Sequence, residues 1–309
     1  MSAPRGVLAV VGATATGKSA LSVEVALRLG GEIISADAFT AYRGIDAGTA
    51  KPTIEERRGV PHHLVDIKEP ADPFSAGEFA RLARAASIEI LSRGKLPILC
   101  GGTGFYVRAF FEGLFVGPPR DERFRAALRI LQERHGAPWL VRALGLIDPE
   151  SGARISQRDG ARAIRYLEIA FSTGRRPSDL FRERPGERWE GSAVKVVLTL
   201  PRPILYGRIE RRFRESIMTR LPDEVRRLLE VGVPSTAPAM AAIGYRETVD
   251  LVEGRLPAGE WMETVVRQTR RYAKRQETWF RSEPDLLLFR ADTPGLVDEV
   301  VAASGPLFS

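Results

Sequence analysis

The sequence predicts an α/β fold, a parallel sheet flanked by helices, that carries an inserted all-helical domain. Short apolar runs rich in β-branched residues alternate with amphipathic segments of helical period, and this alternation is typical of a parallel sheet covered by helices. A glycine-rich turn joins the first apolar run to the first amphipathic segment. From residue 121 to about 184 the chain is instead rich in arginine, helical in period and almost without strand signals, which predicts the insert.

The elements of the sheet follow in order along the chain. The expected strands are residues 7–11, 32–35, 96–100, 194–200 and 286–289. The helices expected to cover this sheet are residues 18–29, 75–93, 203–220 and 259–281, of which the last two are long and basic. A Gly-Pro-Pro break begins at Gly117. We therefore predict a first part of the core at 1–116, a helical insert at 117–190, and a return to the core with C-terminal basic helices at 191–309.

Composition and charge narrow the class of protein. The chain has 309 residues with a charge of 46 − 39 = +7 and a sequence pI of about 9.8, which favours an anionic partner. Cys100 is the only cysteine, so no intrachain disulfide forms and a reducing cytoplasm is expected. No apolar stretch approaches the length of about 18 residues that a membrane span requires, and no secretory signal is expected.

A phosphate-binding loop is the strongest motif. Residues 12–19 match G-x-x-x-x-G-K-[ST] between a predicted strand and a predicted helix, which is the context of a P-loop. Its backbone amides, the helix start and the Lys18 ammonium suit a diphosphate, and the Ser19 hydroxyl suits Mg²⁺. The expected diphosphate-binding residues are Gly12, Ala13, Thr14, Ala15, Thr16, Gly17, Lys18 and Ser19. The core is accordingly P-loop NTPase-like.

Polar residues follow other predicted strands. A nucleotide hydrolase would need a strand-ending aspartate for its metal, and Asp37, Asp66 and Asp148 each follow an apolar run. We favour Asp37 as a site carboxylate because it ends the second strand, at the edge where open α/β sheets bind ligands; capping of the next turn is the alternative. Thr103, in the glycine-rich segment after residue 100, either caps a helix or reaches a phosphate or metal.

Together these motifs resemble the tRNA dimethylallyltransferases, also called tRNA isopentenyltransferases. The resemblance runs along nearly the whole chain. Besides the phosphate loop it rests on residues 37–52 (DAFTAYRGIDAGTAKP), 61–66 (PHHLVD), 101–103 (GGT), 159–168 (DGARAIRYLE), 243–247 (IGYRE) and 269–279 (TRRYAKRQETW).

The resemblance implies transfer of a dimethylallyl group from dimethylallyl diphosphate to the exocyclic amine of the adenine next to the anticodon on its 3′ side, with release of diphosphate. It assigns Asp37 as the acceptor of the amine proton, and an aspartate with its usual pKa near 3.9 is ionised at pH 7 without tuning. It further assigns Lys18 and Arg212 to the leaving diphosphate. Mg²⁺ is the expected cofactor, held by Ser19 and Thr103.

The expected macromolecular partner is the anticodon stem-loop of tRNA, and we expect a cytoplasmic monomer. The target adenine must leave its stack to react, and Tyr42, Tyr245 and Trp279 are candidates for base stacking, with burial in the core as the alternative. The expected tRNA-binding residues are Asp37, Ala38, Phe39, Thr40, Arg158, Asp159, Arg162, Gly244, Tyr245, Arg246, Lys274, Arg275, Gln276, Thr278, Trp279 and Arg281.

Two residues depart from the pattern of the family, and three other functions compete. The family usually has serine at the position of Ala38 and a larger residue at that of Gly104. The rivals are a small-molecule kinase of the P-loop class, an isopentenyltransferase acting on free adenine nucleotides, and an RNA-binding protein with an inactive phosphate site. The kinase leaves the basic insert and C-terminal helix unexplained, and the presence of Lys18, Ser19, Asp37 and Thr103 argues against the inactive protein.

Overall fold

The computed structural model describes residues 5–183 and 186–308 and divides the chain into two compact units. One unit comprises Met1–Phe111 together with Trp189–Ser309, and the other comprises Glu112–Arg188. These divisions lie close to the predicted ends of the insert at 117 and 190.

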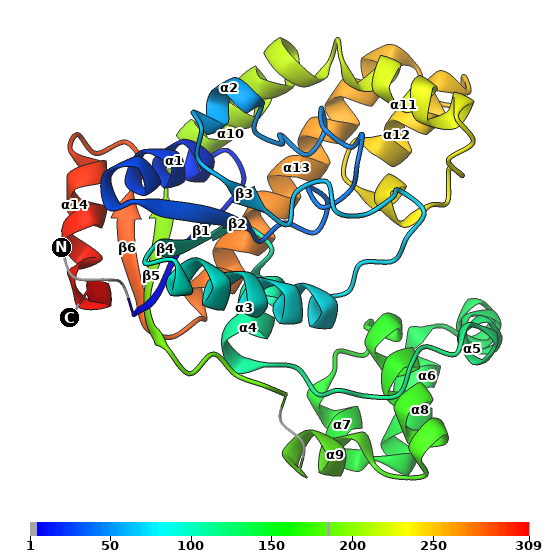
Figure 1. The fold of residues 1–309 in the computed structure, drawn as a ribbon. Helices are drawn as coiled ribbons and strands as arrows, with labels where there is room; N and C mark the ends of the chain where they lie inside the picture. Colours follow the sequence, from blue (N-terminus) through cyan, green and yellow to red (C-terminus); the bar gives the residue numbers. More distant parts are fainter. Residues whose placement is uncertain (1–4, 184–185, 309) are drawn as a thin grey trace. The chain divides into compact units, whose positions relative to one another are not determined.

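A six-stranded sheet, parallel at every pairing, forms the centre of the first unit. Its strand order is β3-β2-β4-β1-β5-β6 (Figure 1). The strands are β1 (Gly6–Gly12), β2 (Gly31–Ser35), β3 (His62–His63), β4 (Leu96–Gly101), β5 (Ser192–Thr199) and β6 (Leu286–Arg290). The predicted α/β class is confirmed, and only the short β3 had no counterpart among the predicted strands.

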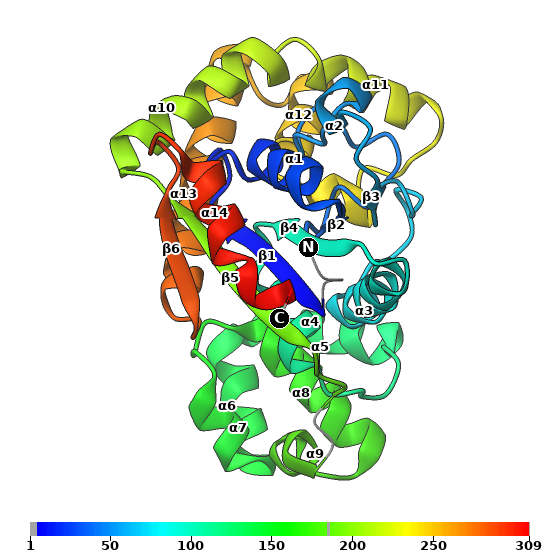
Figure 2. The same ribbon diagram turned by 60° about the vertical axis from the view of Figure 1, so that its left-hand side comes forward.

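Strand β1 lies inside the sheet, and its residues 7–11 are fully buried. Leu8 and Val10 pack in one cluster with Leu21 and Val25 of the first helix and Val300 near the C-terminus. The opposite face of the sheet contacts other helices, α3 at β2 and β4 and α13 at β1 (Figures 1 and 2). A strand buried on both faces needs a continuous apolar run, which is why the alternation expected of a half-exposed strand is absent.

The helices of the first unit begin and end where the sequence provides caps. The first helix follows Gly17 and ends at Gly30, whose φ of 67° gives the left-handed C-cap that favours glycine. Ser75 caps α3 by accepting a hydrogen bond from the Glu78 amide. The helices are α1 (Lys18–Leu29), α2 (Ile54–Arg57), α3 (Ala76–Ser92), α4 (Gly104–Glu112), α10 (Arg202–Arg212), α11 (Leu221–Glu230), α12 (Tyr245–Val252), α13 (Ala258–Arg281) and α14 (Leu296–Ala303), with short 3₁₀ turns at Pro238–Ala241 and Gly305–Phe308.

The single helix predicted over 203–220 is wrong in its second half. The α-helix ends at Arg212 and continues as a π-helical turn, Phe213–Ile217, in which the Met218 amide donates to the Phe213 carbonyl at 2.8 Å. Phe213 and Ile217 are buried in a separate apolar cluster with Trp261 of α13. The wider turn keeps both side chains in that cluster, and hydrophobic spacing alone does not reveal it.

The second unit is helical throughout its regular structure, as predicted for the insert. Leu140 and Leu144 lie at the centre of its own apolar core with Ile164 and Leu167. Asp148 is fully buried and accepts hydrogen bonds from Ser151 and Ser178, so it is a structural cap and the metal-ligand alternative for it is wrong. The helices are α5 (Glu122–His135), α6 (Ala137–Ile147), α7 (Pro149–Arg154), α8 (Gly160–Thr173) and α9 (Pro177–Glu183).

Within the described ranges, none of the helices combines the length and the apolar character needed to cross a bilayer.

Candidate active site

The phosphate loop follows β1 and turns back on itself before α1. Gly12, Ala15 and Gly17 have φ values of 140°, 64° and 96°, which is the left-handed region that curls a backbone around an anion. The Lys18 ammonium donates to the Ala13 carbonyl at 2.7 Å. Burial lowers the pKa of Lys18 to about 8, although Cys100 and Asp37 favour its charged form. The site therefore holds a partly desolvated cation, which favours an anionic ligand.

Asp37 leaves the carboxyl end of β2 and faces the same cavity as the loop. Its Oδ1 accepts a hydrogen bond from the Phe39 amide at 2.9 Å. Burial raises the pKa of this carboxyl, and the Phe39 amide, Lys18 and Arg212 oppose the rise. The sequence-based expectation of an ordinary aspartate pKa is therefore wrong, because it took no account of the lost solvation.

Thr103 is brought beside Asp37 by the loop after β4. Its Oγ1 accepts from the Ala38 amide at 3.3 Å, and its own amide donates to the Ala36 carbonyl at 3.3 Å. The Thr103 carbonyl accepts from the first amides of α4. The capping alternative for the Thr103 side chain is thus wrong, because the hydroxyl is directed to the Asp37 loop instead.

Helix α10 adds two arginines to the phosphate loop. Arg212 donates to Thr14 Oγ1 at 3.2 Å, and Arg208, one turn earlier, donates to the Thr16 carbonyl at 3.4 Å. Burial lowers the pKa of Arg212 and the nearby Asp37 carboxyl opposes the shift. Sequence reasoning named Arg212 but missed Arg208, although the spacing of four residues places both on one face of the helix.

Lys18, Asp37, Arg208 and Arg212 line one cavity of about 820 Å³. Its wall includes Gly48, Thr49, Ala50 and Pro52, from a segment that is part of the sequence resemblance. That segment is held from behind: Glu224 accepts from the amides of Asp46 and Ala47 at 3.0 Å each, and the buried Lys51 ammonium donates to Asp66 at 2.5 Å. Asp66 is therefore an ion-pair partner of Lys51, and its interpretation as a metal ligand finds no support.

Tyr245 joins two motifs that lie far apart in the sequence, residues 37–52 and residues 243–247. Its ring is fully buried, its hydroxyl donates to Glu224 and accepts from the Gly48 amide, and a Cβ at position 48 would meet the ring at 2.5 Å. The predicted contacts of Tyr245 and the buried Gly244 with tRNA are wrong for this reason. Tyr42, 3% exposed, is likewise a core residue. Arg246 alone of that motif is exposed.

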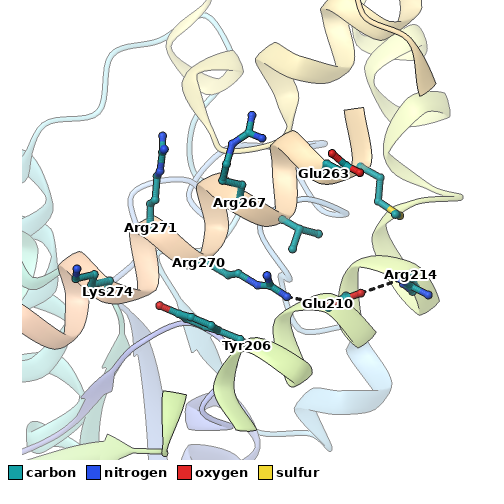
Figure 3. A pocket seen from close by; sticks show the side chains of 10 residues that line it. Tyr206, Glu210, Arg214, Glu263, Arg267, Arg270, Arg271 and Lys274 are labelled. Atoms are coloured by element: carbon teal, nitrogen blue, oxygen red, sulfur yellow. Dashed lines mark hydrogen bonds and ion pairs between the residues drawn. The ribbon is translucent and has the colours of Figure 1, made fainter. Parts of the chain in front are cut away.

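The three residues of the Lys-Arg-Gln motif on α13, Lys274, Arg275 and Gln276, have different surroundings. Arg275 lines the cavity that holds Asp37, whereas Lys274 lines a second hollow of about 500 Å³ between α10 and α13 (Figure 3). Gln276 is 5% exposed, and both ends of its amide are hydrogen-bonded within the protein. The predicted direct contact of Gln276 with tRNA is therefore wrong.

Trp279 packs against α4. A Cβ on Gly104 would meet its ring at 2.2 Å, and the Arg108 guanidinium lies 4.4 Å from the ring centroid. The close approach explains why glycine stands at 104 in this chain. Arg108 thus covers one face of the indole ring, and that face is not open to stacking on a base.

The remaining predicted tRNA-binding residues occupy different surroundings. In the insert, Asp159 caps α8 by accepting from the Arg162 amide at 3.0 Å, while the Arg158 and Arg162 side chains are exposed. Ala38 and Phe39 are half-buried, and the Thr40 hydroxyl is buried against Ser35 at 2.8 Å. Thr278 and Arg281 are exposed on α13.

Two cavity residues on α13 also escaped sequence reasoning. Thr269 and Tyr272 line the cavity together with Arg275 and Gln276. The Tyr272 hydroxyl lies near Thr103 and Gln276, and burial raises its pKa to about 12. Helical spacing back from Gln276 was the signal that could have found them.

Two family models and several known proteins match this chain. The model for IPP transferase matches residues 40–283, and the model for isopentenyl transferase matches residues 5–69. The chain belongs to the IPP transferase family. A tRNA dimethylallyltransferase of Thermomicrobium roseum is 44% identical over 97% of this chain and 91% of its own length. One of Geobacillus thermodenitrificans is 44% identical over 93% of this chain and 91% of its own.

Solved structures of IPP transferases share the fold. A tRNA isopentenylpyrophosphate transferase from Bacillus halodurans superimposes with a TM-score of 0.73 at 38% identity, covering 98% of this chain and 97% of its own. A eukaryotic dimethylallyltransferase acting on tRNA gives a TM-score of 0.75 at 25% identity, covering 93% of this chain and 74% of its own.

Proposed function

We propose that this enzyme transfers a dimethylallyl group from dimethylallyl diphosphate to the exocyclic amine of the adenine 3′ of the anticodon in tRNA. The observation that carries the proposal is the cavity that Lys18 and Arg212 line together with a half-buried carboxylate, Asp37, whose pKa both cations lower. A site with cations for a leaving anion and a base for an amine suits this reaction. The names of the relatives support the choice of substrates.

The diphosphate half of the site stabilises charge separation. When the allylic C1–O bond breaks, its electron pair stays on the ester oxygen that links C1 to the α-phosphorus, so negative charge grows on the departing diphosphate and positive charge grows on C1. Lys18, Arg212 and the amides of the phosphate loop lie where they stabilise the departing diphosphate more in the transition state than in the ground state. No nucleotide needs to be hydrolysed for the loop to serve this purpose.

The acceptor half of the site handles one proton. The N6 lone pair of adenine forms the new C1–N6 bond, and the amine proton passes to the free oxygen of Asp37. The Phe39 amide holds Oδ1 of this carboxylate, which leaves Oδ2 to face the amine. The proposal assigns Thr103, whose Oγ1 accepts from the Ala38 amide beside Asp37, to the same adenine edge.

Mg²⁺ fits this site as a companion of the substrate. Across residues 5–183 and 186–308, no three histidine, cysteine or acidic side chains gather in a group that would hold a metal alone. The cavity instead offers Asp37 and the Ser19 hydroxyl, with Thr103 adjacent through the Ala38 amide, and Mg²⁺ commonly binds through few protein oxygens with substrate phosphates. A bound Mg²⁺ would neutralise charge on the diphosphate.

The basic surface supports tRNA as the acceptor. Arg246, Arg275 and Arg281 are exposed in the core unit, and Arg158 and Arg162 are exposed in the insert. Such side chains attract the phosphate backbone in a salt-dependent way, and this binding offsets the few kcal/mol needed to unstack a base. The same proposal places the enzyme in the cytoplasm with its tRNA substrate, acting as a monomer.

The test is incubation of the purified protein with unmodified tRNA, Mg²⁺ and dimethylallyl diphosphate, followed by mass analysis of the digested nucleosides. We expect a five-carbon addition on one anticodon-loop adenosine. Parallel reactions with AMP and with ATP separate the rivals. Prenylation of free AMP, or ATP consumption without prenyl transfer, would contradict the proposed acceptor.

A further inference from the structure

Gln276 joins the two loops that bear the catalytic groups. Its Oε1 accepts from the Thr14 amide of the phosphate loop at 2.8 Å, and its Nε2 donates to the Gly102 carbonyl at 2.8 Å. These loops follow the neighbouring strands β1 and β4. One side chain, reaching in from α13, thus connects the diphosphate-binding loop to the loop of Thr103.

The surroundings of Gln276 leave this side chain little choice of conformation. It is 5% exposed, and a Cβ at position 102 would meet Nε2 at 2.3 Å. A buried amide whose donor and acceptor are both used is costly to displace, because each loop would keep an unpaired backbone group. Gly102 is therefore required for the approach of the Gln276 amide.

Tyr272, one turn earlier on α13, lies beside the same groups. Its hydroxyl is near Thr103 and Gln276, and Thr103 accepts from the Ala38 amide beside Asp37 at 3.3 Å. Gly102, which Gln276 contacts, directly precedes Thr103, so the contact made by Gln276 lies next to the residue that is hydrogen-bonded to the Asp37 segment.

We propose that Gln276 is a positioning residue that fixes the phosphate loop at a set separation from Thr103 and Asp37, so that the diphosphate and the acceptor amine are held in register. This role rests on the proposed function for its catalytic meaning. It also assigns the Thr14 amide to Gln276, leaving the amides from Ala15 onward to the diphosphate. Preorganisation of this kind removes ordering that binding would otherwise have to supply.

The first test compares Gln276→Leu with Gln268→Leu. Gln268 lies two turns earlier on the same helix and donates to Glu247 at 2.6 Å, so its loss removes a similar bond away from the cavity. Titration calorimetry with Mg²⁺ and inorganic diphosphate measures the affinity of the phosphate loop for its anion. We expect Gln276→Leu to weaken diphosphate binding about 10- to 100-fold and Gln268→Leu to leave the diphosphate affinity unchanged.

Affinity for tRNA, measured by filter binding, separates positioning from direct contact. The positioning role predicts that the Kd of Gln276→Leu for tRNA stays within about twofold of the wild type. Weakened tRNA binding with unchanged diphosphate binding would overturn the proposal, as would equal loss of diphosphate affinity in both variants. These diphosphate titrations keep their meaning even if the wild-type enzyme fails to prenylate tRNA, which would contradict the proposed function alone.

Gln276→Glu gives a readout that general destabilisation does not move. A protonated glutamic acid can donate to the Gly102 carbonyl and accept from the Thr14 amide, whereas its ionised form only accepts and repels that carbonyl. The ratio of variant to wild-type diphosphate affinity should therefore improve as pH falls. A ratio that stays flat from pH 5 to pH 9 would overturn the proposal.

Discussion

Two hollows are lined by cations from α10 and α13: the inner cavity of about 820 Å³, which holds Asp37, and the outer hollow of about 500 Å³ between the two helices. The cations have different surroundings in the two. In the inner cavity, burial lowers the pKa values of Lys18 and Arg212 and raises that of Asp37. In the outer hollow, Arg214 and Arg270 each donate to Glu210 at 2.8 Å, while Arg271 is exposed (Figure 3). Loss of solvent, more than the mere presence of charge, distinguishes a surface that attracts anions from a site equipped for chemistry.

The largest effect should come from the inner carboxylate. Asp37→Asn preserves the acceptor for the Phe39 amide but cannot take a proton, so we expect kcat to fall by about 10² to 10⁴ with tRNA affinity unchanged. The acidic limb of the pH–rate profile, which lies above the usual range of an aspartate because burial raises the pKa of Asp37, should disappear. Rate measurements across a range of pH check the loss of kcat and of the acidic limb, and filter binding checks the affinity for tRNA. A collapse of tRNA affinity would make Asp37 a binding residue instead.

The lowered pKa of Lys18, a cation of the inner cavity, predicts the alkaline limb of the pH–rate profile. A pKa lowered from 10.5 to about 8 means that the ammonium is present below that pH and lost above it. We therefore expect kcat/KM for dimethylallyl diphosphate to fall about tenfold per pH unit above 8. Lys18→Arg keeps its charge there and should move this limb upward. An identical alkaline limb in both proteins would exclude Lys18 as its source.

The contact between Gly104 and Trp279 tests how firmly α13 is held between the hollows. Gly104→Ala places a Cβ where the indole ring now lies, so we expect a loss of about 1–3 kcal/mol in the free energy of unfolding. Denaturant titration measures it, with Gly77→Ala in α3, where only the Ser75 side chain lies within 4 Å, as the control. Equal stability of the two variants would contradict the tight packing.

The smallest effect concerns the exposed cations of the outer hollow. Arg271→Ala and Lys274→Ala should each reduce the slope of log Kd for tRNA against log salt by about 1, with kcat almost unchanged. Arg275→Ala, on the catalytic side, should change kcat/KM for tRNA as well. A lower kcat in the Lys274 variant would remove the functional distinction between the two hollows.

The parallel sheet and the phosphate loop could be predicted because their signals are local. The apolar run of β1, the glycines that end α1 and the loop spacing each act within about one element. Asp37 and Thr103 were predicted as neighbours of the same sheet edge because the carboxyl ends of parallel strands meet there. The structure places Asp37 on the cavity wall and Thr103 next to it, where its hydroxyl accepts from the Ala38 amide.

The environment of each side chain on α13 could not be predicted from local spacing. Three consecutive residues, Lys274 to Gln276, enter the outer hollow, the inner cavity and the buried loop contact. Burial of Tyr245 depends on Gly48 and Glu224, almost 200 and about 20 residues away along the chain. The raised pKa of Asp37 and the π-helical turn after Arg212 arise likewise from packing between distant segments.

The most direct test of the division between the hollows is a calorimetric titration of dimethylallyl diphosphate into the wild type, Arg212→Ala and Arg214→Ala. The two arginines lie two residues apart, but Arg212 donates to Thr14 in the phosphate loop and Arg214 donates to Glu210 in the outer hollow. We expect Arg212→Ala to lose at least about tenfold in affinity, since a charged hydrogen bond is removed, and Arg214→Ala to bind as the wild type does. The reverse order would place the diphosphate in the outer hollow and contradict the account.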